Sequence, residues 1–311
     1  MEVIMNNMKK IILAILGFVP FFGIAQQDPQ YSMYMFNGMA INPGYAGSNE
    51  GLNANVLYRT QWTGIPGAPK TIVANVHSPF FNEKIGAGLS FNNDQIGVMD
   101  RNTISLAGAY HLHFTTFRIA MGIQANYSQY NIGLGDVMHS LDNTIDPTFG
   151  ANLKESTINF GAGIFYYSKN LYGGISIPHI MKNELASQEV TAVTKSYEIP
   201  HIFYHVGYVY EIDPMFALKP SVLVKQVSGA PINADINLNV YYKKMIGVGV
   251  GYRTNSAAVA MLEVQAHPYF KIGYAYDREF NDLGTIAGST HEIMLRFMMG
   301  PKGSQISPRL F

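Results

Sequence analysis

The sequence predicts an all-β protein: a transmembrane antiparallel β-barrel of about 14 strands with an N-terminal plug or hook segment. Three observations support this fold class. Apolar and polar residues alternate along most of the chain, charged residues make up only 14% of it, and the long connections between the predicted strands all fall on one side. Average soluble proteins carry roughly 25% charged residues, so a chain this poor in charge either buries most of its surface or exposes it to lipid.

The N-terminus predicts the compartment. Lys9 and Lys10 precede an apolar run that ends in small residues at Ala25. This order of charged, apolar and small residues is typical of a secretory signal peptide. A membrane anchor is the alternative, and it is disfavoured because the run is short and contains Pro20. We therefore expect residues 1–25 to be removed by cleavage near Ala25.

The alternation is clearest over residues 232–242. A strand places successive side chains on opposite faces, whereas a helix would mix the two sets. One face carries Ile232, Ala234, Ile236, Leu238, Val240 and Tyr242, and the other carries Asn233, Asp235, Asn237, Asn239 and Tyr241. Most of the predicted strands are roughly 9–14 residues long, which is enough for the ~9–11 residues that a tilted membrane-crossing strand needs. Within a barrel domain of residues 51–298 the predicted strands are 51–62, 70–79, 84–93, 101–115, 117–131, 156–168, 170–178, 199–212, 215–227, 231–242, 244–254, 256–267, 269–278 and 289–298.

The connections give an independent indication of a barrel. Every second one is short: 80–83, then those near 116, 169, 213–214, 243 and 268. The long ones, 132–155, 179–198 and 279–288, all fall in the other set. Outer-membrane barrels have short periplasmic turns and long outer loops, so we expect the long loops at the cell surface. Loops at that position commonly carry function, and the partner-binding candidates in them are Asp146, Phe149, Glu189 and Tyr197.

Residues 26–50 form a separate N-terminal segment that is too aromatic for a solvated tail. It contains Tyr31, Tyr34 and Phe36, and Asn42-Pro43-Gly44 supplies a turn toward the first strand. We expect a plug at or inside the periplasmic mouth, because many predicted lumen positions are glycine and leave space. The alternative is a periplasmic hook that docks another protein. Residues 299–311 are expected to form a polar C-terminal tail.

The composition and the motifs predict no catalysis. The 21 basic and 21 acidic residues cancel, which argues against a nucleic-acid binder, and the chain has no cysteine. His111 and His113 share one face of a predicted strand, but no third ligand is identifiable near them, so polar lumen lining is favoured over a metal site. No hydrolase or metalloprotease motif is present. We expect no enzymatic activity, no cofactor and no metal.

Aromatic residues are abundant, with 20 Tyr, 18 Phe and one Trp. Many of them fall near the ends of predicted strands. Girdles of aromatic residues at the two membrane interfaces are typical of outer-membrane barrels. A carbohydrate-binding surface is the alternative, and the clustering at strand ends favours the girdle.

Several short motifs resemble one known family. They begin just after the predicted cleavage site and continue to the last strand: Gln27-Asp28-Pro29-Gln30-Tyr31, Tyr34-Met35-Phe36-Asn37, Ile41-Asn42-Pro43-Gly44-Tyr45-Ala46-Gly47-Ser48, Arg59-Thr60-Gln61-Trp62, Gly67-Ala68-Pro69-Lys70-Thr71, His77-Ser78-Pro79, Gly86-Ala87-Gly88-Leu89, Asn93-Asp94-Gln95-Ile96-Gly97 and Ser289-Thr290-His291-Glu292-Ile293. Together they are similar to the PorP/SprF family over essentially the whole mature chain. The resemblance singles out Asp28, Pro29, Tyr31, Asn42, Pro43, Tyr45, Gly47, Arg59, Trp62, His291 and Glu292 as family-motif or structural positions.

The resemblance implies an outer-membrane protein of Bacteroidota that works in the type IX secretion system. Members are associated with the export or surface attachment of secreted proteins, including gliding adhesins. The implied partners are outer-membrane lipid and either the C-terminal domain of a secreted protein or another secretion component, with no nucleic acid. The alternative function is a transport barrel for a small or hydrophobic solute.

Overall fold

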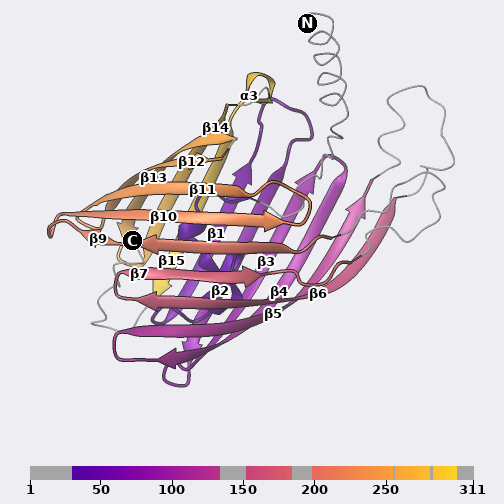
Figure 1. Ribbon diagram of the computed structural model, residues 1–311. Helices are drawn as coiled ribbons and strands as arrows, with labels where there is room; N and C mark the ends of the chain where they lie inside the picture. Colours follow the sequence, from indigo (N-terminus) through magenta and orange to yellow (C-terminus); the bar gives the residue numbers. More distant parts are fainter. Residues whose placement is uncertain (1–29, 134–151, 184–197, 255, 281–282, 300–311) are drawn as a thin grey trace, which may run out of the picture.

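The computed structural model describes residues 30–133, 152–183, 198–254, 256–280 and 283–299. Its strands form one antiparallel sheet that closes on itself, because β10 pairs with both β8 and β11 (Figure 1). The strands are β1 (Leu52–Thr60), β2 (Lys70–Phe80), β3 (Ile85–Ile96), β4 (Met99–His113), β5 (Phe117–Ile132), β6 (Leu153–Ser168), β7 (Leu171–Ile177), β8 (His201–Tyr208), β9 (Tyr210–Glu211), β10 (Phe216–Val227), β11 (Asn233–Tyr242), β12 (Ile246–Arg253), β13 (Ala257–His267), β14 (Phe270–Glu279) and β15 (Thr290–Met299).

The barrel wall has fourteen strand positions in the described part of the chain. The short β9 is the continuation of β8 after Val209, and it pairs with the same neighbour, β10. The predicted all-β barrel of about 14 strands is therefore confirmed. The first and last strands, β1 and β15, pair over nine residues and form the seam that closes the barrel. No helix among the described residues is long and apolar enough to cross a membrane.

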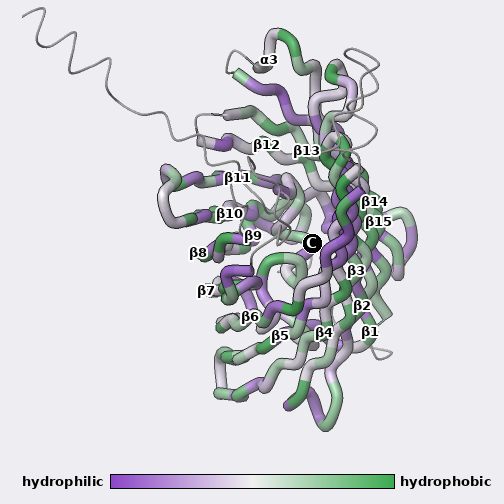
Figure 2. The backbone as a smooth tube through the Cα atoms, turned by 90° about the vertical axis from the view of Figure 1, so that its right-hand side faces the viewer, coloured by the Kyte–Doolittle hydropathy of each residue, from purple (hydrophilic) through white to green (hydrophobic). Residues whose placement is uncertain are grey.

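The two faces of the wall differ as the alternation predicts. On β11, Ile236 and Leu238 are 50% and 43% exposed, whereas Asn237 and Asn239 are 5% and 2% exposed. Figure 2 shows the alternation as hydrophobic and hydrophilic stretches that follow one another along the strands. The apolar side chains face outward, where lipid replaces water, and the polar ones face the lumen.

One end of the barrel carries tight turns. The β11–β12 turn places Lys243 and Lys244 at φ 49° and 59°, and positive φ at both central residues is typical of a tight type I′ hairpin turn. The β2–β3 turn at residues 81–84 lies at the same end. The opposite end carries the longer connections, among them 280–289 with the short helix α3 (Leu283–Ile286).

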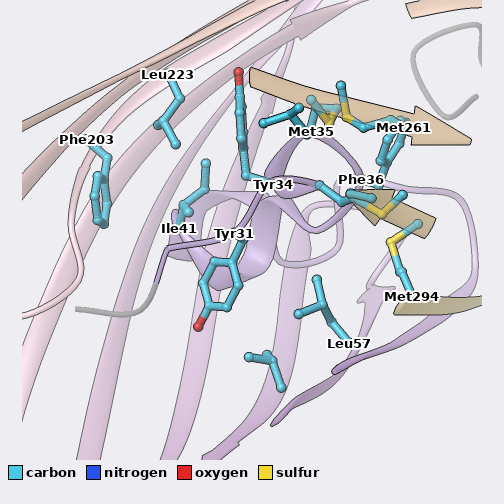
Figure 3. Packing of buried hydrophobic residues seen from close by; sticks show 14 of the residues in the cluster. Tyr31, Tyr34, Met35, Phe36, Ile41, Leu57, Phe203, Leu223, Met261 and Met294 are labelled. Carbon is cyan, nitrogen blue, oxygen red and sulfur yellow. The ribbon is translucent and has the colours of Figure 1, made fainter. Parts of the chain in front are cut away.

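The interior is occupied by the chain itself. Three short 3₁₀ helices precede β1: η1 (Tyr34–Phe36), η2 (Gly38–Ala40) and η3 (Pro43–Tyr45). The hydrophobic side chains of η1 join inward-facing residues of the wall in one buried cluster (Figure 3). Met39 of η2 and Tyr45 of η3 pack in smaller clusters against other parts of the wall. The core of this protein is therefore the contact between residues 30–49, here called the lumen segment, and the inner face of the barrel.

Candidate functional site

The lumen segment runs along the inside of the barrel from the long-loop end toward the short-turn end. Near its start, Ser32 contacts Arg59, close to the end of β1. Further along, the carbonyl oxygen of Phe36 accepts a hydrogen bond from Asn55, four residues nearer the start of β1. The segment is predicted to form a plug at or inside the periplasmic mouth, and in the structure it lies along the lumen beyond that mouth. The described part of the segment does not form a hook outside the barrel.

Ser32 makes hydrogen bonds through both its hydroxyl group and its backbone N–H. Its hydroxyl donates to Asp277 Oδ2 at 2.7 Å and accepts from Arg59 Nη1 at 2.8 Å and Arg253 Nη2 at 3.3 Å. Its backbone N–H donates to Glu292 Oε2 at 2.9 Å. The N–H of Met33 donates to the other oxygen of the same carboxylate, Oε1, at 2.8 Å. One serine is therefore joined to four strands, β1, β12, β14 and β15.

The charged residues around Ser32 balance one another. Arg59 contacts both Asp277 and Glu292 at 2.8 Å, and Arg253 contacts Asp235 at 2.8 Å. Lys225 completes the group at 2.7 Å from Asp235. Three cations face three carboxylates, all of them at most 5% exposed. Through the hydrogen bonds of Ser32, this network holds the start of the segment against the wall.

The aromatic residues of the segment also have defined partners. Tyr34 donates its hydroxyl to Ser221 and accepts from Asn237. The ring of Phe36 lies 4.8 Å from Lys219 Nζ and 5.9 Å from the guanidinium carbon of Arg296. Cations at such distances from a ring face are attracted to it. These contacts hold the start of the segment against β10, β11 and β15.

The Asn42-Pro43-Gly44 turn is fixed by the side chain of Asn42. Its Oδ1 accepts from the N–H of Gly44 at 2.8 Å, which caps η3, and its Nδ2 donates to the carbonyl of Ile164 at 3.0 Å. Proline at the first helical position suits this cap because its missing N–H would have no partner there. The predicted turn is therefore also an attachment to β6.

Two histidines hold the last part of the segment. Gly47 donates its N–H to His77 Nδ1 at 3.1 Å. The carbonyl of Ala46 accepts from His111 Nε2 at 2.9 Å, and Tyr167 lies 2.8 Å from the other ring nitrogen of His111. His113, in contrast, is exposed at the end of β4 and contacts the carbonyl of Glu83. His111 and His113 thus do not converge, and no group of three potential metal ligands occurs in the described ranges.

Glycines in the wall make room for the backbone of the segment. A Cβ at Gly86 would overlap the carbonyl of Ala46, and a Cβ at Gly122 would overlap the amide of Gly44. Only a residue without a side chain permits such close approach of two backbones. Four further lumen glycines make room for side chains of the segment: Gly88 for Met39, Gly163 and Gly174 for Asn42, and Gly273 for Met33.

The structure brings most of the sequence-predicted motif residues to this interior. Tyr31, Asn42, Pro43, Gly47, Arg59 and Glu292 are buried, and Tyr45 is half-buried. Trp62 and His291 are half-buried and lie elsewhere: Trp62 starts the β1–β2 loop, and His291 contacts Tyr274 at 2.7 Å. Asp28 and Pro29 lie outside the described residues, as do the partner-binding candidates Asp146, Phe149, Glu189 and Tyr197.

Sequence reasoning missed the partners that complete the network. Ser32, Arg253 and Asp277 carry no recognisable motif, and they come together only through the register of β12, β14 and β15. The sequence did contain one indication of these residues, since Arg253 and Asp277 are charged and fall on inward-facing positions. A charged residue inside a packed barrel needs a partner.

Fold and interior together define a class: a membrane β-barrel whose lumen is filled by its own N-terminal segment. The chain belongs to the PorP/SprF family, since residues 23–297 match the family described as "Type IX secretion system membrane protein PorP/SprF". It is an outer-membrane barrel of that secretion system.

Solved barrels resemble the chain only distantly. A FadL homologue of Pseudomonas aeruginosa is 12% identical, with a TM-score of 0.47 over 87% of this chain and 94% of that one. The toluene transporter TodX of P. putida is 8% identical, with a TM-score of 0.45 over 88% and 95%. The KdgM porin is 9% identical, with a TM-score of 0.39 over 79% and 99%. No curated protein matches the chain.

Proposed function

We propose that this barrel is a closed, partner-binding component of the type IX secretion system and not a conduit for solutes or an enzyme. It would support the export or cell-surface attachment of secreted proteins, adhesins among them. Its partner would be the C-terminal domain of a secreted protein or another component of the system. The observation that carries the proposal is the lumen segment, whose buried contacts occupy the space that a transported solute would need.

The form of these contacts supports a permanent closure. A gate that opens in each transport cycle would have to separate Ser32 and Met33 from Glu292 and Arg59. Each broken contact would leave a buried charge without its partner, which is costly in a low-dielectric interior. The segment is also continuous with β1 through only two residues, Glu50 and Gly51, so it has little freedom to swing away.

Because the lumen is filled, a partner would have to bind at one of the two ends of the barrel. We propose that loops 132–155 and 179–198 contact the partner, with Asp146, Phe149, Glu189 and Tyr197 as candidate residues. These are the longest connections, and barrels carry their variable functional elements in such loops.

Two deletions of equal length test the proposal. Removing residues 30–37 should raise the conductance of the protein that still folds, measured in planar bilayers, because the lumen is opened. Its partner should still co-purify, because loops 132–155 and 179–198 are unchanged. Removing residues 140–147 should leave the protein without measurable conductance and should reduce the amount of partner that co-purifies with it. Steady conductance of the intact protein, or partner loss only upon the first deletion, would contradict the proposal. The first result would favour solute transport, and the second would make the segment a docking element.

A further inference from the structure

We propose that the lumen segment has a second role, as a latch that closes the seam between β1 and β15 while the barrel folds. The seam joins strands that are more than 200 residues apart in the chain. Other neighbouring strands of the wall are consecutive in sequence and are joined by a connection of their own, so the β1–β15 pair has the largest loop to close.

The inner face of β1 is covered by the segment along its length. Asn53 accepts from Asn49 at 3.1 Å, Asn55 donates to the carbonyl of Phe36 at 3.2 Å, and Arg59 donates to Ser32. Leu57, between them, is fully buried in the cluster that contains the aromatic residues of the segment. All four inward-facing residues of β1 thus belong to the contact with the segment.

The same segment also contacts the inner face of β15. Glu292 accepts the N–H groups of Ser32 and Met33, Met294 lies in the shared cluster, and Arg296 lies over the ring of Phe36. Across the seam, Arg59 and Glu292 are paired directly in register. The segment therefore bridges the two strands from inside, in addition to the hydrogen bonds that the strands make with each other.

The short link between the segment and β1 gives this bridge its effect. Once Ser32 and Met33 are bound to Glu292, β1 can leave the neighbourhood of β15 only as far as the chain between Met33 and Leu52 allows. Tethering of this kind raises the effective concentration of one strand at the other. Docking of the segment and pairing of the seam then become one event.

Pairs of engineered cysteines can follow the seam directly, because the chain has no cysteine of its own. Val56 and Leu295 face each other across the seam, and both point outward, being 48% and 46% exposed. Val248 and Leu262 form the matched control on neighbouring strands, at 55% and 45% exposure. Directly opposed residues of an antiparallel pair lie within disulfide reach.

The experiment compares disulfide formation at the two cysteine pairs while urea-unfolded protein folds into detergent micelles under mild oxidant. In Ser32→Ala, the seam disulfide should form about tenfold more slowly, the factor expected for lost hydrogen bonds to charged groups, and the control disulfide should keep its rate. Ser128→Ala is the matched variant, since Ser128 is a buried lumen serine that contacts Thr103 and not the segment; it should change neither rate. If Ser32→Ala leaves the seam rate unchanged, or slows both pairs equally, the segment is an ordinary part of the core and the latch proposal is wrong.

Discussion

Arg59 and Glu292 lie opposite each other on the first and last strands of the barrel, with Nη1 and Oε2 2.8 Å apart. Each is also bonded to the lumen segment, Arg59 through the hydroxyl of Ser32 and Glu292 through two backbone N–H groups. Arg59 and Glu292 therefore connect the pairing of β1 with β15 to the position of the lumen segment inside the barrel.

Glu292→Gln should destabilise the barrel by about 3–5 kcal/mol, the usual cost of removing one partner of a buried ion pair. The amide keeps the shape of the side chain but not the charge that Arg59 and the two N–H groups face. The measurement is the denaturant midpoint, read by the loss of the folded band in electrophoresis without heating. Glu279→Gln is the control, because Glu279 is only half-buried and its carboxylate accepts a hydrogen bond from the neutral hydroxyl of Ser256. Equal shifts in the two variants would contradict the role given to Glu292.

Gly86→Ala should cost about 1–3 kcal/mol, the range for overpacking a filled interior. The added methyl group would press on the carbonyl of Ala46, which is backbone and cannot rotate away. Gly108→Ala is the control, since a Cβ at Gly108 has nothing within 4 Å. The decisive comparison repeats Gly86→Ala in protein lacking residues 30–48. A loss that persists there could not come from contact with the segment.

Leu238→Arg should cost about 2–4 kcal/mol if the residue lies near the bilayer midplane, because the outer wall faces lipid. Ile232→Arg, on the same outward face but before the start of β11, should cost about 0–1 kcal/mol, as expected near an interface. Both residues are exposed to the surroundings of the barrel, at 43% and 62%. Refolding equilibria in lipid vesicles measure the loss of folding free energy in each variant. A larger loss for Ile232→Arg would mean that Ile232, and not Leu238, lies nearer the bilayer midplane.

Most of the barrel could be predicted from sequence because lipid outside and polar groups inside impose a period of two on every strand. The alternation over residues 232–242 gives the correct face for each residue of β11. Connection lengths could be predicted for the same reason, since a closed barrel separates its turns into two ends.

The interior could not be predicted to the same extent. Alternation places Asn239 on the lumen side but does not show whether the lumen is hollow. With a hollow lumen, Asn239→Arg would cost little; in the structure Asn239 is 2% exposed and packs against the position of Gly249, so we expect a substantial loss. Likewise, Ser32 and Asp277 are 245 residues apart, and only the closed register of the sheet brings them together.

The orientation of the barrel gives the last prediction. Short turns are expected in the periplasm and long loops at the cell surface. A cysteine at Asp146, in the longest connection, should react with a membrane-impermeant maleimide in intact cells. A cysteine at Asn82, exposed in the β2–β3 turn at the other end, should react only after lysis. Because the chain has no cysteine of its own, any label on the purified chain comes from the engineered position. The lumen segment begins near the long-loop end of the barrel and continues into β1 at the short-turn end. The same labelling therefore also determines how the segment is oriented relative to the membrane. Labelling of Asn82 but not Asp146 in intact cells would reverse the orientation and move the proposed partner contacts to the periplasm.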